Sequence, residues 1–512
     1  MSEPLLDPAI PWLFARARSD PRALAIRCDG EEISFAELAA RSEAVARRLR
    51  TLGVEPEDRV AALVGSSVRF VELVHAVQRL GAALVPLNTR LTTAEILALL
   101  DDCRPRLLIV DPQSAALASE VAPRRSGTRM IEAGAGIDRV SPSCELPEPR
   151  LDAHSICTIV YTSGTTGKAK GAMLTHANHF ASASASRANL ALRPGDRWLA
   201  VLPLHHVGGL SILLRSVIDG SAVVLHRGFD AGRVERAIHE QGITLLSLVA
   251  TTLRRLLDHS AGRRYPRSLR AVLVGGGATP AELLERARAL GIPALATYGL
   301  TEAASQVTTE PLGGDRGAAG SAGRPLAGTR VAIADPDVHG DGEILVAGPT
   351  VMAGYLGRSE ETERALRGGW LHTGDVGRLD ASGRLHVHDR RSDLIVSGGE
   401  NVYPTEIEAV LLGHPDVSEA AVYAVADPEW GQHVGAAVVL RAGRHLDSGE
   451  LREWCAARLA RFKLPRTIRF VDSLPRTASG KVMRHEVGLL ATRNDTSNRL
   501  PPSTLSERPS KR

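Results

Sequence analysis

Short apolar runs alternate with amphipathic segments through the first half of this chain. Two amphipathic segments begin with the pattern of a helix capping box, Ser34-Phe-Ala-Glu37 and Thr92-Thr-Ala-Glu95. Apolar runs such as RVAALV, ALVPL and RLLIV separate the helical segments. Strands that alternate with helices form parallel sheets covered by helices. We therefore predict an α/β fold.

The pattern changes after about residue 315, and the length of 512 residues exceeds what one compact core can hold. The stretch DVHGDG is typical of a hairpin, and residues 392–490 read as a compact α+β unit. We predict a large N-terminal domain of several layered sheets and helices at 1–391, a small α+β C-terminal domain at 392–490 and a disordered tail at 491–512.

Composition excludes several classes of protein. The net charge is only +4 and no basic block occurs, so a nucleic-acid partner is not favoured. The five cysteines are scattered without a C-x-x-C pair, which argues against a zinc site or a disulfide framework. No apolar run has the length of a membrane span, and the N-terminus lacks the apolar core of a signal peptide. We expect a cytoplasmic protein.

The loop YTSGTTGKAKGAMLTH at 161–176 gathers glycines, hydroxyl groups and two lysines. Lysine is rare in this chain and occurs only at positions 168, 170, 463, 481 and 511. All other Lys or Arg positions are arginine. A glycine-rich loop is often a plain turn, but glycines, backbone N–H groups and a compact ammonium group also suit a phosphate. Ala169 follows Gly167-Lys168, so the loop is not the G-x-x-x-x-G-K-[ST] motif of nucleotide-binding kinases and ATPases.

Four further motifs follow in order: YGLTEAASQ at 298–306, HTGDVG at 372–377, DRRSDLIVSGGENVYP at 389–404 and PRTASGKVMR at 475–484. Together with the glycine-rich loop, they resemble the adenylate-forming superfamily of acyl-CoA synthetases, luciferases and adenylation domains. The resemblance covers about residues 10 to 490. It implies that MgATP activates a carboxylic acid as an acyl-adenylate, and that coenzyme A then takes the acyl group. The C-terminal domain of such enzymes is mobile.

The resemblance also implies roles for individual residues. ATP would be bound by Thr162, Ser163, Gly164, Thr165, Thr166, Gly167, Lys168, Gly276, Tyr298, Gly299, Thr301, Glu302, Asp375, Arg390 and Lys481. Among these, Tyr298 would stack on adenine, Asp375 would accept the ribose hydroxyls and Glu302 would hold Mg²⁺. The acyl group would meet His206, Gly275, Gly277, Ser305 and Gln306.

Two half-reactions would share this site. The ammonium group of Lys481 would offset charge on the attacked phosphoryl group, so Lys481 and His206 are the catalytic candidates. The C-terminal domain would then rotate about a hinge at Ser392. This rotation would bring Gly398 and Gly399 beside coenzyme A.

The acid is suggested by the residues after Glu302. Ser305 and Gln306 can hydrogen-bond a polar acyl group. The motifs resemble most those of the o-succinylbenzoate–CoA ligases of menaquinone biosynthesis. A medium-chain fatty-acyl or aryl acyl-CoA synthetase is the alternative, and a stand-alone enzyme that loads a carrier protein is less favoured. A homodimer is possible, since relatives are often dimers.

Overall fold

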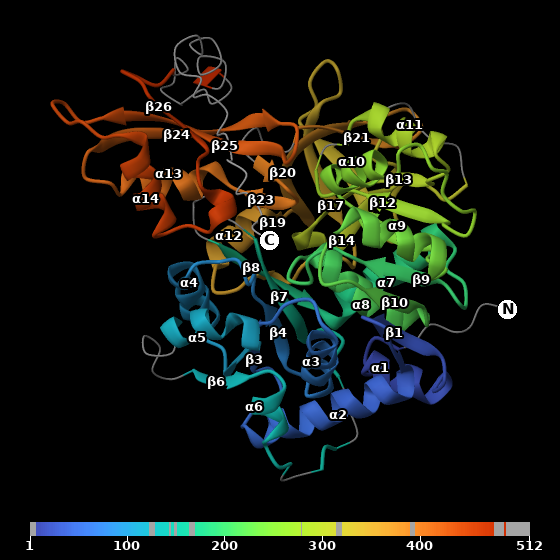
Figure 1. The fold of residues 1–512 in the computed structure, drawn as a ribbon. Coiled ribbons are helices and arrows are strands. Elements are labelled where there is room, and N and C mark those ends of the chain that lie inside the picture. The colour runs from blue at the N-terminus through green and yellow to red at the C-terminus, as the bar shows by residue number, and fades with distance from the viewer. Residues whose placement is uncertain are drawn as a thin grey trace, which may run out of the picture.

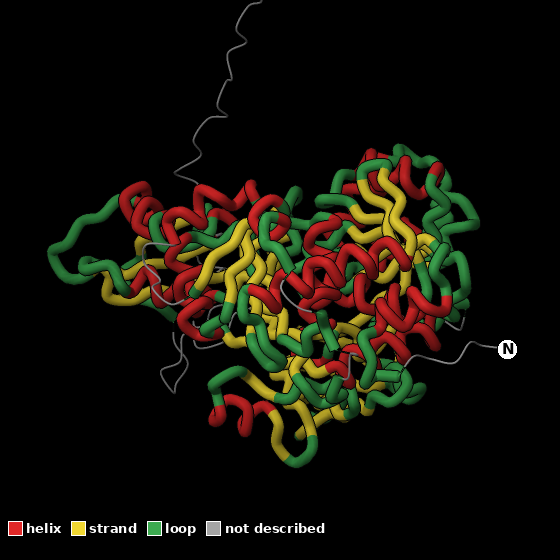
Figure 2. The backbone as a smooth tube through the Cα atoms, turned by 90° about the horizontal axis from the view of Figure 1, so that it is seen from below, coloured by secondary structure: helices red, strands yellow, loops and turns green. Residues whose placement is uncertain are grey.

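The computed structural model describes residues 7–121, 128–142, 145–147, 151–162, 169–277, 279–313, 320–389, 395–475 and 486–487. Two large sheets and the helices around them form the N-terminal part of the chain (Figure 1). The C-terminal part lies against one end of these layers (Figures 1 and 2). In the described ranges, no helix is long and apolar enough to cross a membrane.

The first large sheet has nine strands in the order β15-β14-β13-β12-β11-β9-β10-β1-β2. Strands β1 and β9 to β13 run parallel, while β2, β14 and β15 are antiparallel additions at the two edges. The bounds are β1 Leu24–Cys28, β2 Glu31–Ser34, β9 Arg197–Ala200, β10 Ala222–Leu225, β11 Leu245–Leu248, β12 Ala271–Val274, β13 Ala294–Leu300, β14 Ser305–Thr309 and β15 Arg324–Pro325.

The second large sheet has seven strands in the order β18-β8-β7-β4-β3-β5-β6. Five neighbouring strands run parallel, namely β7, β4, β3, β5 and β6. Strand β8 pairs antiparallel with β7, and β18 pairs antiparallel with β8. The bounds are β3 Arg59–Leu63, β4 Ala83–Pro86, β5 Leu107–Val110, β6 Arg129–Glu132, β7 Ile156–Thr162, β8 Lys170–Thr175 and β18 Gly354–Tyr355.

Helices α7 and α8 lie between the two large sheets, because α7 contacts β8 and β14 while α8 contacts β9, β10 and β14. One apolar core therefore continues through both sheets and includes Trp12, Phe35 and Trp198. The helices of this part are α1 Trp12–Ser19, α2 Phe35–Thr51, α3 Val68–Arg79, α4 Thr93–Cys103, α5 Ala115–Val121, α6 Ala135–Asp138, α7 His176–Leu190, α8 Val207–Asp219, α9 Ala231–Glu240, α10 Ala250–His259, α11 Ala281–Ala289 and α12 Ser359–Ala365.

Both predicted capping boxes are present. Ser34 caps α2 and Thr92 caps α4, each by a reciprocal pair of hydrogen bonds with the glutamate three residues on. The parallel strands between helices confirm the predicted α/β class.

A five-stranded antiparallel sheet follows the large layers, and DVHGDG joins its first two strands as the predicted hairpin. Its strands are β16 Arg330–Ala334, β17 Gly342–Ala347, β19 Leu366–Arg367, β20 Trp370–Leu379 and β21 Leu385–Asp389.

The last sheet belongs to the C-terminal part and has its own apolar core around Ile407, Val422 and Leu451. Its elements are β22 Ile395–Ser397, β23 Glu400–Val402, α13 Pro404–Leu412, β24 Val417–Asp427, β25 Gly431–Leu440, α14 Ser448–Ala456, the 3-10 turn η4 Arg461–Lys463 and β26 Thr467–Phe470.

One predicted helix is shorter than its sequence pattern. LREWCAARLARF at 451–462 suggests a continuous helix, but α14 ends at Ala456. Leu459 and Ala460 are buried, and a 3-10 turn follows in which Lys463 N donates to Ala460 O at 2.9 Å. Burial of these side chains outweighs the helix propensity of the segment. The turn directs the Lys463 side chain toward α4.

Candidate active site

The ends of the glycine-rich loop are held by a β-hairpin. Strands β7 and β8 pair antiparallel, with Thr162 opposite Lys170, and Thr162 Oγ1 donates to Lys170 O at 3.5 Å. The candidates between them, Ser163, Gly164, Thr165, Thr166, Gly167 and Lys168, lie outside the described residues. Their phosphate-binding role stays a prediction.

Tyr355 connects the base of this loop with Glu302. Its hydroxyl donates to Glu302 Oε1 at 2.9 Å, and the Lys170 ammonium lies 5.3 Å from its ring centroid. The antiparallel pairing of β18 with β8 places Tyr355 there. Glu302 is half-buried and offers the hard carboxylate oxygen that Mg²⁺ prefers, and Tyr355 links it to Lys170 at the end of the predicted phosphate loop. The sequence analysis missed Tyr355, because its short strand has no motif of its own.

A cavity of about 420 Å³ beside β13 brings together three of the predicted ATP-binding residues, Gly276, Tyr298 and Gly299. It is lined by Gly275, Gly276, Gly277, Tyr298 and Gly299 among other residues. The Tyr298 hydroxyl donates to Asp375 Oδ2 at 2.7 Å, and both side chains are buried. The predicted adenine and ribose residues are thus direct neighbours. Arg390, also predicted there, lies outside the described residues.

A second cavity of about 170 Å³ receives the predicted acyl-group residues. His206, Gly275, Ser305 and Gln306 line it, whereas Gly277 lines only the nucleotide cavity. The walls are apolar and come from several elements. They include Leu202, Val207, Leu248, Leu273 and Leu300. This is the composition of a small-molecule pocket with a few polar groups.

Backbone geometry at this cavity is unusual. Ser305 has a φ of 99°, a left-handed conformation that is costly for a residue with a Cβ. Gly299 lies against it, and a Cβ there would stand 1.8 Å from Ser305 O. Backbone strain of this kind persists where the surroundings enforce it and often marks a functional site. Here it places the Ser305 side chain at the cavity wall.

Arg215 is a buried cation at the acyl cavity that the sequence analysis did not identify. It is 2% exposed, its Nη2 donates to Ser182 Oγ at 3.2 Å, and its Nε has no hydrogen-bond partner among the described residues. Burial lowers the pKa of the guanidinium to about 10, so it remains charged at neutral pH. Gln306 Oε1 likewise has no partner in the described chain. Both groups suit a polar ligand.

The C-terminal part contributes directly to this cavity. Gly399 and Asn401 line it, and Gly399 has a φ of 89°. A Cβ at Gly398 would stand 2.6 Å from Trp430 Cε3. The glycine segment therefore has little room for side chains, and the structure places its second glycine beside the acyl cavity.

Glu400 holds the glycine segment to the N-terminal part. Its carboxylate lies 3.1 Å from His206 Nε2 and accepts from Arg90 Nη1 at 3.0 Å. Burial opposes ionisation of Glu400, but the hydrogen bond from His206 and the charge of Arg90 outweigh it and lower the pKa to about 2. Burial lowers the pKa of His205 to about 3, so this ring is neutral.

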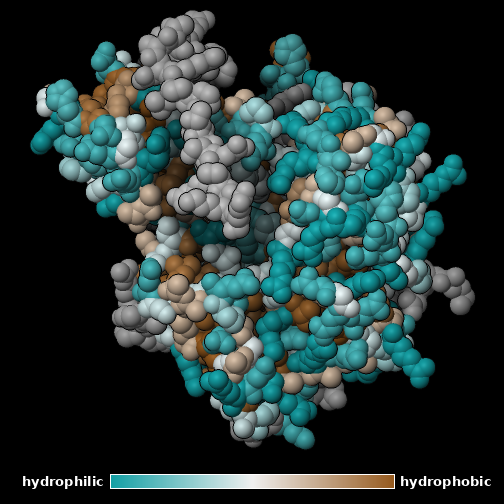
Figure 3. Space-filling model, in the orientation of Figure 1, coloured by the Kyte–Doolittle hydropathy of each residue, from teal (hydrophilic) through white to brown (hydrophobic). Residues whose placement is uncertain are grey.

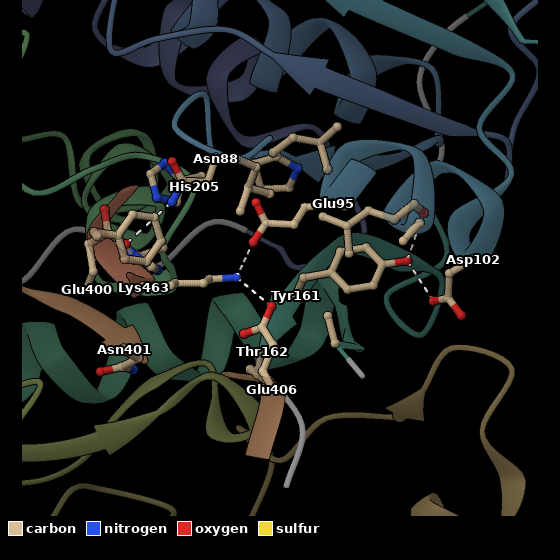
Figure 4. Close-up of a pocket in the computed structure, with 18 of the residues that line it drawn as sticks. Asn88, Glu95, Asp102, Tyr161, Thr162, His205, Glu400, Asn401, Glu406 and Lys463 are labelled. Atoms are coloured by element: carbon tan, nitrogen blue, oxygen red, sulfur yellow. Dashed lines mark hydrogen bonds and ion pairs between the residues drawn. The ribbon is translucent and has the colours of Figure 1, made fainter. Parts of the chain in front are cut away.

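A third cavity of about 520 Å³ lies between α4 and the C-terminal part, and its lining residues converge in Figure 4. His206 and Asn401 line both this cavity and the acyl cavity, so they mark the boundary between the two. The predicted catalytic Lys481 and the predicted hinge Ser392 lie outside the described residues.

Family models identify the chain. A model described as "AMP-binding enzyme" matches residues 13–356, which is more than half of the sequence. The chain belongs to the AMP-binding enzyme family. A model of the AMP-binding enzyme C-terminal domain matches residues 406–481. The predicted superfamily is thereby confirmed, while the predicted domain boundaries remain predictions.

Two curated relatives of this AMP-binding enzyme share a name. The 2-succinylbenzoate–CoA ligase of Geobacillus kaustophilus is 43% identical over 491 residues, which are 94% of this chain and 98% of the relative. The ligase of the same name from Bacillus mycoides is 40% identical over 481 residues, which are 93% of this chain and 97% of the relative. The predicted nearest resemblance is confirmed.

Solved structures agree with this AMP-binding enzyme to different degrees. A double mutant of the o-succinylbenzoate CoA synthetase of Bacillus subtilis, bound with its product analogue OSB-NCoA, has a TM-score of 0.87 at 39% identity, with coverage of 93% of this chain and 98% of that chain. The same synthetase in complex with the acyl-adenylate intermediate OSB-AMP has a TM-score of 0.71 at the same identity and coverage. An amide bond synthetase from Marinactinospora thermotolerans scores 0.83 at 30% identity, with coverage of 93% and 99%.

Proposed function

We propose that this enzyme is an ATP-dependent 2-succinylbenzoate–CoA ligase. In the first half-reaction, a carboxylate oxygen of the acid attacks the α-phosphorus of ATP, and pyrophosphate leaves. In the second, the sulfur of coenzyme A attacks the acyl carbon, and AMP leaves. Structures of the Bacillus subtilis relative in complex with ATP and magnesium ion, with OSB-AMP and with OSB-NCoA support each stage.

The observation that carries the choice of acid is the buried guanidinium of Arg215 in the acyl cavity. A 2-succinylbenzoate molecule keeps one carboxylate after the other is activated. A planar guanidinium with an unused Nε–H matches that carboxylate, and a charged hydrogen bond in a buried site is strong. A fatty or simple aryl acid would leave the buried Arg215 Nε without a hydrogen-bond partner among the described residues, which is unfavourable.

Gln306 offers a contact for the keto group of the acid. Its Nε2 donates to Thr309 Oγ1 at 3.0 Å, while Oε1 has no partner among the residues that the structure describes. The amide can turn over, because the Thr309 hydroxyl can donate as well as accept and the two orientations are not distinguished by shape. The turned amide presents its NH₂ group to the ligand.

The nucleotide occupies the neighbouring cavity in this proposal. Tyr298 contacts adenine, Asp375 accepts from the ribose hydroxyls, and Thr301 lies toward the α-phosphate. Glu302 would hold the magnesium ion, which offsets the charge of the phosphates when it is bound. Lys481 would stabilise the charge that develops at the α-phosphorus.

Coenzyme A would approach through the third cavity. This cavity adjoins the acyl cavity at His206 and Asn401, so a thiol on a narrow arm can reach the acyl carbon between them. Gly399 lines the acyl cavity at the end of that path. His206 would orient the reacting groups rather than remain a packing residue.

The experiment is a product assay with single acids. The purified protein is incubated with MgATP, coenzyme A and either 2-succinylbenzoate, benzoate, hexanoate or octanoate, and acyl-CoA is identified by mass. We expect 2-succinylbenzoyl-CoA as the dominant product. A faster reaction with a fatty or simple aryl acid would refute the choice of acid. Pyrophosphate release with an amino acid and no thioester would indicate a carrier-loading enzyme.

We also propose a cytoplasmic location and retain the homodimer as a prediction. Support for the location comes from Cys28, Cys103, Cys157 and Cys455, which are all free and buried in the described chain. Fractionation of cells and light scattering of the purified protein test the two points.

A further inference from the structure

Lys463 is one of the rare lysines of the chain, and the proposed chemistry gives it no task. Its ammonium nitrogen lies 2.6 Å from Glu95 Oε1 and 2.6 Å from Glu406 Oε1 (Figure 4). The residue is only 7% exposed. A compact ammonium group with three donors can bind two carboxylates in so narrow a space.

The two carboxylates belong to different parts of the molecule. Glu406 lies in the first turn of α13, in the same C-terminal part as Lys463. Glu95 lies in the first turn of α4, in the N-terminal part. The ion pair between Lys463 and Glu95 therefore exists only while the two parts are docked as they are here, whereas the pair with Glu406 does not depend on docking.

Glu95 is held by contacts that do not involve the C-terminal part. Its Oε2 accepts from Thr92 N at 2.8 Å and from Thr92 Oγ1 at 2.9 Å in the capping box, so both contacts come from the N-terminal part itself, and Oε1 is left for Lys463. A carboxylate held in this way loses little side-chain entropy when the pair forms. The capping box therefore orients the Glu95 carboxylate for the ion pair with Lys463.

Other contacts of the same interface connect Lys463 with the glycine segment at the acyl cavity. The Arg90 guanidinium lies 4.9 Å from the ring centroid of Phe462, the neighbour of Lys463, and Arg90 also binds Glu400. Glu400 follows Gly399, which lines the acyl cavity. Docking at Lys463 and placement of the glycine segment therefore occur in one arrangement.

That arrangement matches one solved form of the Bacillus subtilis synthetase better than others. The TM-score is 0.87 for the form with the product analogue and 0.71 to 0.72 for the forms with OSB-AMP or AMP. These structures of one relative differ from each other in overall arrangement.

We infer that the ion pair between Lys463 and Glu95 holds the C-terminal part in the arrangement that forms the thioester. This inference rests on the proposed ligase function. Lys463 is then a positioning residue for the second half-reaction and has no part in adenylate formation.

The test is the Glu95→Gln variant, because glutamine also serves in a capping box but has no charge for Lys463. Glu37→Gln is the matched control, since Glu37 closes an equivalent capping box at α2, away from the C-terminal part. Pyrophosphate release without coenzyme A reports the first half-reaction. Rapid mixing of the enzyme–adenylate complex with coenzyme A reports the second.

We expect Glu95→Gln to slow thioester formation about tenfold, with adenylate formation unchanged or faster, because a neutral acceptor replaces a charged one. Glu37→Gln should leave both rates unchanged. Adding Lys463→Gln to Glu95→Gln should cost less in the thioester step than Lys463→Gln costs alone, since the pair is already broken.

Equal rates of thioester formation in Glu95→Gln and the wild type would overturn the inference, and so would equal slowing of both half-reactions. Failure of the ligase proposal would give a different experimental result. In that case the wild type itself makes no 2-succinylbenzoyl-CoA, and the same comparison of variants is made with the acid that it does activate.

Discussion

In the proposed function, single buried polar atoms select the acid that binds in the acyl cavity. Arg215 and Gln306 each have one polar atom without a hydrogen-bond partner in the described ranges, inside a largely apolar wall. An unpaired buried donor costs free energy until a ligand meets it, so such a site rejects ligands that lack the matching group. The sequence suggested Gln306 through its motif, but Arg215 is one arginine among many and only the tertiary structure places it at the cavity.

The first prediction concerns Arg215. In Arg215→Gln, we expect kcat/KM for 2-succinylbenzoate to fall about 100-fold, because a charge-assisted hydrogen bond to the free carboxylate is lost. The value for benzoate should change little, since benzoate has no second carboxylate. Steady-state kinetics with the two acids measure this. An equal loss for both acids would assign Arg215 to packing alone.

The second prediction concerns Tyr298. Tyr298→Phe keeps the ring that would contact adenine and removes the hydroxyl that donates to Asp375. We expect the KM for ATP to rise about fivefold, because one hydrogen bond that orients Asp375 is lost. The KM for the acid should stay constant. A loss confined to the acid would contradict the assignment of this cavity to the nucleotide.

At the level of elements, the local sequence determined those helix starts and turns that tertiary packing did not override. The capping boxes at Ser34 and Thr92 and the hairpin at DVHGDG were predicted from residues within one turn, and all three are present. The end of α14 was missed, because burial of Leu459 and Ala460 decides it. Short strand β18 was missed because it has no sequence motif of its own, and Tyr355 was missed with it.

Strand β23 supplies a pH-dependent contact through Glu400. The folded pKa of about 2 lies below the ordinary value of 4.5, so its contribution to stability is full above pH 4.5 and disappears as the pH falls toward 2. We expect Glu400→Gln to reduce the free energy of unfolding by about 1–3 kcal/mol at pH 6. Urea unfolding of both proteins from pH 6 to pH 3 should show this difference shrinking below pH 4.5. A difference that is constant over this range would disprove the ionised state of Glu400.

On the scale of the whole molecule, the acyl cavity is completed by residues almost two hundred positions apart, such as His206 and Gly399. The sequence predicted that the glycine segment reaches coenzyme A, through a resemblance and not through any local pattern. The docked arrangement itself was not predictable, because it depends on long-range pairs such as Lys463 with Glu95.

The two lysines of the C-terminal part should act on opposite half-reactions. We expect Lys481→Ala to slow adenylate formation by about 10²–10³, because a positioned charge at the phosphoryl group is lost. Thioester formation from preformed adenylate should be affected much less. Single-turnover rates of each step measure the split. Equal losses in both steps would refute the assignment of Lys481 to the first.

The central claim is that a 2-succinylbenzoyl group lies between Arg215 and Gly399. A crystal structure of this protein with 2-succinylbenzoyl-CoA tests it most directly. We predict the free carboxylate within hydrogen-bond distance of Arg215 Nε, Gln306 near the keto oxygen, and the thioester beside Gly399 and His206. A free carboxylate bound elsewhere, with Arg215 still unpaired, would contradict the account.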